Sequence, residues 1–105
     1  MKKTNKVTVL AEYTILPGFE KEVMEAAEIV WLETLKEPGC ESYFFTTRKE
    51  SPNAVFCYEV FRSQAEFDQH LSADYTQDFL EKLKGKVEGG VRKTTFVEDF
   101  EHTIN

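Results

Sequence analysis

The chain has 105 residues, of which 41% are hydrophobic, 13% aromatic and 30% charged, and its formal net charge is −6 at pH 7. This length suits one domain with a modest core, and these proportions are typical of a folded globular protein rather than a disordered one. The negative charge argues against nucleic acid as a partner, because binding to phosphates requires a basic surface. We therefore expect a single domain over residues 1–105, with its core at about residues 7–100.

The cysteine content and the hydropathy of the chain bear on the cellular compartment in which we expect the protein. Cys40 and Cys57 are too few for a disulfide framework and lack the spacing of a metal motif, so we expect two reduced, buried thiols. The N-terminal stretch "MKKTNKVTVLAEY" is too short and too polar for a signal peptide. No stretch is long and apolar enough to span a membrane, so we expect a cytoplasmic protein without a membrane partner.

Residues 7–15, "VTVLAEYTI", alternate between apolar and other side chains, which predicts a strand with one buried face. That face carries Val7, Val9, Ala11, Tyr13 and Ile15. Residues 17–18, Pro-Gly, end the strand. Residues 19–37 then show helical spacing of apolar side chains, with glutamates on the opposite side. The segment "EPGC", residues 37–40, ends this helix because proline cannot continue it and glycine permits the reversal.

The second half of the chain predicts two strands, a helical segment and a last strand. The strands are "CESYFFTTR" at residues 40–48 and "AVFCYEVFR" at residues 54–62, joined by a "KESPN" turn. A helix follows from Ser63, which forms a capping box with Glu66, and a break is expected around residues 72–74. Gly89-Gly90 ends the helix, and residues 91–100 form the fourth strand.

The resulting order β-α-β-β-α-β predicts an α+β protein of the ferredoxin-like class, an antiparallel sheet with its helices on one face. The opposite face is predicted to be apolar, because Leu10 lies there and Tyr43 and Phe44 must project to opposite sides. A bare aromatic sheet face is typical of a partner site. We therefore expect a homodimer formed through this face of the sheet.

Several spaced signals together resemble the antibiotic biosynthesis monooxygenase family. They are the Pro-Gly after the first strand, "EPGC..Y", "YEVF" at the end of the third strand, "S.AEFDQHL" and "F...L", and they extend from about Val7 to Phe100. The resemblance implies a dimeric α/β barrel with a pocket between the sheet and the helices. Some members oxygenate anthrones or quinols without metal or flavin, one branch degrades haem, another isomerises a phosphorylated breakdown product of autoinducer-2, and many have no assigned substrate.

The haem-degrading branch does not fit these residues. It requires an asparagine on the first strand, which "VTVLAEY" lacks, and a tryptophan where Phe61 stands, and His70 falls earlier than the axial ligand should. A metal site built on His70 and Asp74 lacks a third ligand. We therefore expect neither a cofactor nor a bound metal.

His70 and Glu59 are the predicted catalytic pair. His70 shares a helix face with Phe67 and Leu71, so a neutral imidazole beside a bound phenol can act as general base. Glu59 shares a strand face with Cys57 and Phe61 and can orient the imidazole. The alternatives are a histidine that serves structure only and a Glu59 ion pair with one of three cations. These cations are Arg62, Arg92 and Lys93.

The predicted walls of the pocket are aromatic side chains and two positions of the first strand. They are Phe61, Phe67, Tyr75, Phe79, Ala11 and Tyr13. The remaining aromatic candidates, Tyr43, Tyr58 and Trp31, are expected to serve the core or an interface rather than the ligand.

The leading hypothesis is a monooxygenase that acts on a small phenolic or quinol compound with O2 and no cofactor. Two alternatives stay open. One is an isomerase of a small phosphorylated diketone, which requires a basic residue such as Arg92 or Lys93 in the pocket. The other is a dimeric barrel that binds a small ligand without turnover.

Overall fold

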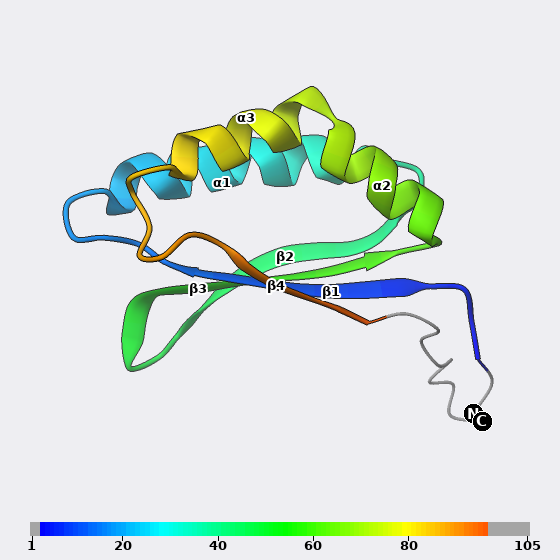
Figure 1. Cartoon of the computed structure of the whole chain (residues 1–105), viewed down its shortest axis with the longest axis horizontal. Coiled ribbons are helices and arrows are strands. Elements are labelled where there is room, and N and C mark those ends of the chain that lie inside the picture. Colours follow the sequence, from blue (N-terminus) through cyan, green and yellow to red (C-terminus); the bar gives the residue numbers. More distant parts are fainter. Residues whose placement is uncertain (1–2, 97–105) are drawn as a thin grey trace.

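The computed structural model describes residues 3–96, with four strands and three helices in this part of the chain. In chain order these are β1 (Val7–Thr14), α1 (Glu20–Thr34), β2 (Cys40–Arg48), β3 (Ser51–Phe61), α2 (Gln64–Ser72), α3 (Asp74–Leu83) and β4 (Arg92–Phe96). The helices all lie on one face of the sheet (Figure 1). None of these helices is long and apolar enough to cross a membrane.

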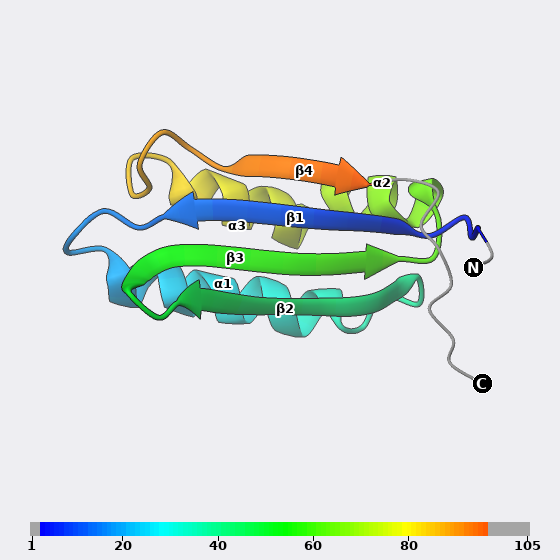
Figure 2. The same cartoon turned by 90° about the horizontal axis from the view of Figure 1, so that it is seen from below.

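The strands form one antiparallel sheet in the order β2-β3-β1-β4, which confirms the predicted ferredoxin-like class. The alternation along β1 is also confirmed, because Val9 and Tyr13 face the helices and are 0% and 5% exposed. On the other face, no helix among the described residues covers the strands (Figure 2). Phe44 and Tyr58 lie there with their ring centroids 5.4 Å apart, and both are at least 40% exposed.

The core consists of two clusters beneath the helices. The first packs α1 and α3 against the sheet and includes Tyr13, Val30 and Phe79. The second lies under α2 and includes Val9, Tyr43, Cys57, Phe61 and Phe67. Trp31 joins α1 to the second cluster, since its indole Nε1 donates a hydrogen bond to the Tyr43 carbonyl at 3.0 Å. This bond gives Trp31 the structural role that the sequence indicated.

The break in the second helical segment is confirmed, but the segment ends earlier than predicted. Ala73 has extended backbone angles (φ −63°, ψ 142°) and separates α2 from α3. α3 ends at Leu83 rather than at Gly89-Gly90, because Gly85 adopts a left-handed φ of 75° that ends the helix earlier. Val87 then pairs with Ile15 in an isolated bridge.

Two further details of the prediction were wrong. The turn before β3 is shorter than "KESPN", because Asn53 belongs to the strand and its side chain donates to the Ile15 carbonyl at 3.0 Å. Ser63 is the N-cap of α2, but its hydroxyl contacts the Glu66 carboxylate and makes no capping bond to the backbone. The capping box is therefore incomplete. The part of the last strand predicted beyond Phe96 lies outside the described residues.

Candidate active site

The turn between α1 and β2 fixes the position of the Glu37 carboxylate. The Glu37 amide donates to the Thr34 carbonyl at 2.9 Å, and the Gly39 carbonyl accepts from the Arg62 amide at 2.8 Å. Gly39 itself lies against α2 so closely that a Cβ at this position would overlap the Glu66 side chain. The glycine of "EPGC" thus lets the turn approach α2, which brings Glu37 next to the residues of the α2–α3 junction.

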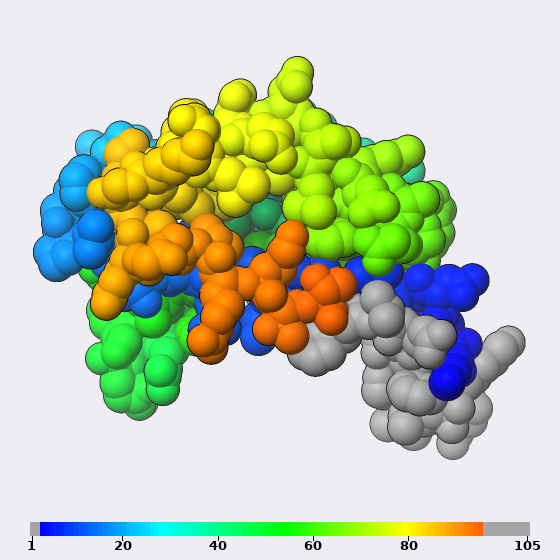
Figure 3. Space-filling view, viewed as in Figure 1, coloured from blue at the N-terminus to red at the C-terminus, as the bar shows by residue number. Residues whose placement is uncertain are grey.

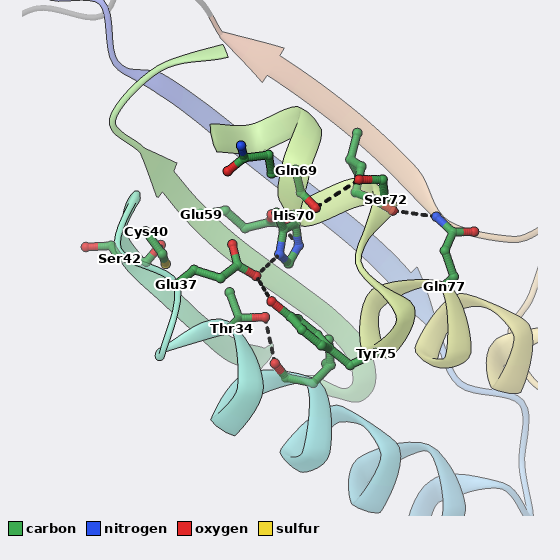
Figure 4. Close-up of polar contacts among 12 residues, drawn as sticks. Thr34, Glu37, Cys40, Ser42, Glu59, Gln69, His70, Ser72, Tyr75 and Gln77 are labelled. Carbon is green, nitrogen blue, oxygen red and sulfur yellow. Dashed lines mark hydrogen bonds and ion pairs between the residues drawn. The ribbon is translucent and has the colours of Figure 1, made fainter. Parts of the chain in front are cut away.

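Two side chains from that junction converge on Glu37. His70 Nδ1 lies 2.9 Å from Glu37 Oε2, and the Tyr75 hydroxyl donates to the same oxygen at 2.5 Å (Figure 4). In one continuous helix, two residues five positions apart would point about 140° away from each other. The extended backbone at Ala73 removes this restriction, so both donors reach one carboxylate.

His70 is buried, at 3% exposure, and its second nitrogen faces the sheet. Nε2 lies 3.7 Å from Glu59 Oε1, which is too far for a direct hydrogen bond. Since a carboxylate only accepts hydrogen bonds, the contact with Glu37 assigns the proton of the neutral ring to Nδ1. Nε2 then carries the lone pair, and it is this atom that can accept a proton on the side of Glu59.

Burial changes the proton affinity of both groups. It lowers the pKa of His70, while the hydrogen bond and the charge of Glu37 act in the opposite direction. Burial also raises the pKa of Glu59 to about 7, against the influence of the Cys57 thiol and the Lys93 ammonium. The imidazole is therefore neutral near pH 7, and Glu59 can hold or release a proton there.

A cavity of about 240 Å³ lies between the sheet and the α2–α3 helices. Figure 3 shows a hollow between these helices and β4, with atoms of the sheet visible inside it. The lining residues are Ala11, Tyr13, Tyr43, Phe45, Cys57, Glu59, Phe67, His70, Leu71, Thr76, Phe79, Leu80, Val91 and Lys93. Sites for drug-sized ligands begin at about 300 Å³, so this cavity suits a small molecule.

The structure brings together six of the eight side chains that the sequence pointed to. Ala11, Tyr13, Glu59, Phe67, His70 and Phe79 all line the cavity. Phe61 does not, because it is fully buried behind the cavity wall, with its ring centroid 5.3 Å from that of Phe67 and 5.0 Å from that of His70. Tyr75 lines a different hollow of about 190 Å³ together with Glu37 and Gln69.

Of the three cations considered as partners of Glu59, only Lys93 lines the cavity. Arg62 pairs with Glu66 at 3.2 Å, and Arg92 pairs with Glu12 at 3.5 Å. Lys93 lies over the Phe67 ring, with its Nζ 5.3 Å from the ring centroid, and its charge lowers the pKa of Glu59. Lys93 thus acts on Glu59 through its charge.

Glu37 is the functional candidate that sequence reasoning missed. The turn "EPGC" explained the end of the helix, and no further role was sought for its acidic residue. The partner at hydrogen-bond distance from His70 is Glu37, whereas Glu59 lies on the cavity side of the ring. The signal available in the sequence was the place of Glu37, an acidic residue directly before the Pro-Gly turn that lies against α2.

The fold and this site define a small α+β protein with a histidine and a carboxyl group, His70 and Glu59, in the wall of a largely aromatic cavity. The antibiotic biosynthesis monooxygenase family model matches residues 6–82, and the chain belongs to this family. A comparison with curated proteins gives no match.

Solved structures with the same fold share little sequence with this chain. A conserved protein from Methanosarcina mazei Go1 has a TM-score of 0.86 at 22% identity, covering 91% of this chain and 95% of its own. Rv0793 from Mycobacterium tuberculosis has a TM-score of 0.86 at 18% identity, covering 93% and 99%. A structure described as an antibiotic biosynthesis monooxygenase has a TM-score of 0.81 at 17% identity, covering 86% and 95%.

Proposed function

We propose that the protein is a monooxygenase that acts on a small phenolic or quinol compound with O2 and without a metal or flavin. The observation that carries this proposal is the pair His70 and Glu59 in the wall of a largely aromatic and aliphatic cavity. Such a cavity favours a flat organic ring, and the pair can remove a proton from a hydroxyl on that ring. Membership of the family supports the same type of reaction.

In the proposed first step, the substrate hydroxyl gives its proton to Nε2 of His70. The resulting imidazolium keeps its bond to the Glu37 carboxylate, which stabilises the new positive charge. The Tyr75 hydroxyl holds the same carboxylate oxygen in place. Glu59 lies 3.7 Å from Nε2 and has a pKa near 7, so it can carry the proton between the ligand and the imidazole.

In the second step, the electron-rich phenolate reacts with O2 directly. A quinol QH2 and O2 give a hydroxylated quinone and water, so one oxygen atom enters the ring and the other leaves as water. The quinol supplies all the electrons, and the proton on His70 returns to the departing oxygen. The aromatic walls exclude bulk water, which keeps the reactive pair together until the new carbon–oxygen bond forms.

Oxygen uptake with menadiol tests this function. The protein is treated with a chelator, and uptake and product mass are compared for wild type, His70→Ala and the control Glu81→Gln, whose carboxylate lies on the surface beside Lys84. We expect enhanced uptake and a quinone with one added oxygen atom in wild type and in the control, and neither in His70→Ala. Autoxidation instead gives the parent quinone and hydrogen peroxide. If neither menadiol nor related naphthols give an oxygenated product, the proposal fails.

One observation favours the isomerase alternative, because Lys93 in the cavity wall offers a cation to a phosphate. The Glu59 carboxyl shares that wall, and in its ionised form it repels a phosphate dianion. We therefore rank this function second. A phosphorylated diketone that raises the melting temperature of the protein would reverse the ranking.

The homodimer and the cytoplasmic location stay predictions. The exposed pair Phe44 and Tyr58 on the uncovered face of the sheet supports the dimer, because a second copy would remove both rings from water. Light scattering after size-exclusion chromatography tests the dimer, and we expect Tyr58→Lys to shift the mass towards the monomer.

The third alternative is a protein that binds a small ligand without turnover. Such a protein would bind its ligand tightly, would form no product, and would keep its ligand binding in His70→Ala.

A further inference from the structure

His70 separates two hollows of the molecule. One is the cavity of about 240 Å³, whose wall contains His70 and Glu59. The other, which we name the Glu37 hollow, has a volume of about 190 Å³ and is lined by Glu37, Pro38, Gly39, Glu66, Gln69 and Tyr75. The two sets of lining residues, all of them within residues 3–96, have no member in common. Each nitrogen of the His70 ring thus faces a carboxyl group on a different side, since Glu59 lies 3.7 Å from Nε2 and Glu37 lies 2.9 Å from Nδ1.

The Glu37 hollow opens to the surface beside the Glu37 carboxylate. The side chain of Glu37 is 16% exposed, whereas those of His70 and Glu59 are 3% and 7% exposed. Pro38 and Gln69, which line the same hollow, are exposed residues. Figure 4 shows the Glu37 carboxylate between the His70 ring and the Tyr75 hydroxyl. Solvent water can therefore reach the Glu37 carboxylate, whereas Nδ1 of the buried ring contacts the carboxylate.

A ligand in the cavity separates Nε2 of His70 from water. The cavity wall is largely aromatic and aliphatic, and a ring that fills the cavity displaces water from that side of the imidazole. Nδ1 keeps its hydrogen bond to Glu37 on the other side. An imidazole can accept a proton at one nitrogen and release a different proton from the other, because both nitrogens carry protons in the cationic ring. The occupied cavity is therefore connected to solvent through the His70 ring.

We propose that Glu37 is a proton relay that carries protons between His70 and solvent water while a ligand occupies the cavity. This role goes beyond the stabilisation of the imidazolium, because the carboxylate itself takes up and releases the proton. The relay requires only a cavity ligand that exchanges a proton with Nε2, so it does not depend on the oxygen chemistry proposed above.

The steps of the relay balance without any other reactant. A proton from the ligand binds Nε2, and the ring becomes an imidazolium. The Nδ1–H bond then breaks, the proton passes to Oε2 of Glu37, which lies 2.9 Å from Nδ1, and the ring is neutral again with its proton on Nε2. The new carboxyl group gives its proton to water, which restores the carboxylate. The same steps in reverse return a proton to Nδ1 when Nε2 gives its proton back to the ligand.

The charges on the two sides of the ring favour movement of the proton towards Glu37. Burial lowers the pKa of His70, the hydrogen bond and charge of Glu37 raise it, and the charge of Lys93 on the cavity side lowers it. A positive charge on the ring is therefore repelled from the cavity side and attracted to Glu37. Burial raises the pKa of Glu59 to about 7, so below that pH Glu59 adds little charge that would oppose this direction. Burial also raises the pKa of Tyr75, so its hydroxyl keeps its proton and holds the carboxylate in place rather than passing the proton on.

Exchange of the His70 Nδ1 proton with water tests the relay in the protein without a ligand. The rate is measured by NMR water-exchange experiments on isotope-labelled histidine in a His102→Gln background, which leaves His70 as the single histidine. Wild type and Glu37→Gln are compared at the same difference between pH and the measured His70 pKa, so that both contain the same fraction of imidazolium. We expect exchange to be about a hundredfold slower in Glu37→Gln, the lower end of what a positioned acid–base group contributes, because the amide accepts the hydrogen bond but cannot take the proton.

Two further variants make the test specific to the carboxylate of Glu37. The control Glu81→Gln removes a carboxylate that is 71% exposed and pairs with Lys84, and it should exchange like wild type. Glu37→Ala empties the place of the carboxylate in the Glu37 hollow, so added formate should restore exchange in this variant. Formate should not restore exchange in Glu37→Gln, whose side chain occupies the same place.

Two results would overturn the relay. One is exchange in Glu37→Gln that is faster than in wild type, equal to it or slower by less than about tenfold, because a weaker hydrogen bond or a lost charge alone gives these results. The other is a failure of formate to restore exchange in Glu37→Ala. Since the measurement uses neither a substrate nor O2, both results would leave the oxygen-uptake test of the proposed function unaffected.

Discussion

The contact between Glu37 and His70 makes the sharpest prediction, and it can be tested without a substrate. In Glu37→Gln, an amide oxygen can still accept from His70 Nδ1 and from the Tyr75 hydroxyl, but the negative charge is gone. Hydrogen bonds to charged groups contribute about 1.5–3 kcal/mol and neutral ones about 0.5–1.5 kcal/mol. Each of the two bonds should therefore weaken by about 1 kcal/mol, and the free energy of unfolding should fall by about 2 kcal/mol.

The same substitution should lower the pKa of His70 further. Burial already lowers this pKa, and the Glu37 charge and hydrogen bond act against burial by stabilising the imidazolium. The loss of about 1 kcal/mol of that stabilisation lowers the pKa by roughly one unit. His70 then becomes a weaker base, and the rate of proton removal should fall with it.

An NMR titration of the imidazole Cε1–H signal measures this pKa. His102→Gln in all samples leaves His70 as the single histidine of the chain. Urea unfolding of the same samples gives the stability, and Glu81→Gln serves as the control because its carboxylate is 71% exposed and pairs with Lys84 on the surface. An unchanged or raised pKa of His70 in Glu37→Gln would show that Glu37 does not stabilise the imidazolium.

Three further substitutions test the site by stability. The folded state keeps a proton on Glu59 up to a pKa of about 7, whereas the unfolded chain releases it near 4.5. The free energy of unfolding of wild type should therefore fall by roughly 3 kcal/mol between pH 4.5 and 7, and that of Glu59→Gln should not. Equal urea midpoints across this pH range in both proteins would refute the raised pKa. Tyr13→Phe removes a buried hydroxyl that has no hydrogen-bond partner among residues 3–96, so it should stabilise the empty protein by about 1 kcal/mol while Tyr58→Phe changes nothing, and a less stable Tyr13→Phe would mean that the hydroxyl is paired. Gly39→Ala places a methyl group into the Glu66 side chain and should cost about 1–3 kcal/mol by thermal unfolding, whereas wild-type stability would show that α2 yields freely.

Local patterns were sufficient to predict most of the fold. Alternation along β1, the Pro-Gly turns and the aromatic strands each reflect short-range constraints, and together they determine the order of elements and the sheet. The break at Ala73 was also expected from the interrupted helical pattern. The end of α3 was not expected, because Gly85 lies only two residues after Leu83, the last apolar position of the helical pattern, while the stronger Gly-Gly signal lies further on.

The site was predictable where its residues share a face with recognisable neighbours. The strand alternation predicted that Glu59 faces the helices, and the helical spacing predicted that His70 faces the sheet. The contact of Glu37 with His70 could not be found in this way, since it joins residues 33 positions apart through the approach of a turn to a helix. Phe61 and Tyr75 lie outside the cavity lining for a similar reason: their distance from the cavity depends on packing depth, which periodicity does not encode.

The backbone break at Ala73 sets the distance and direction between two side chains that share one carboxylate. An inserted residue at this point would lengthen the connection between α2 and α3, and we expect it to carry the Tyr75 hydroxyl away from Glu37. The number of residues between His70 and Tyr75 is therefore as much a part of the site as the residues themselves.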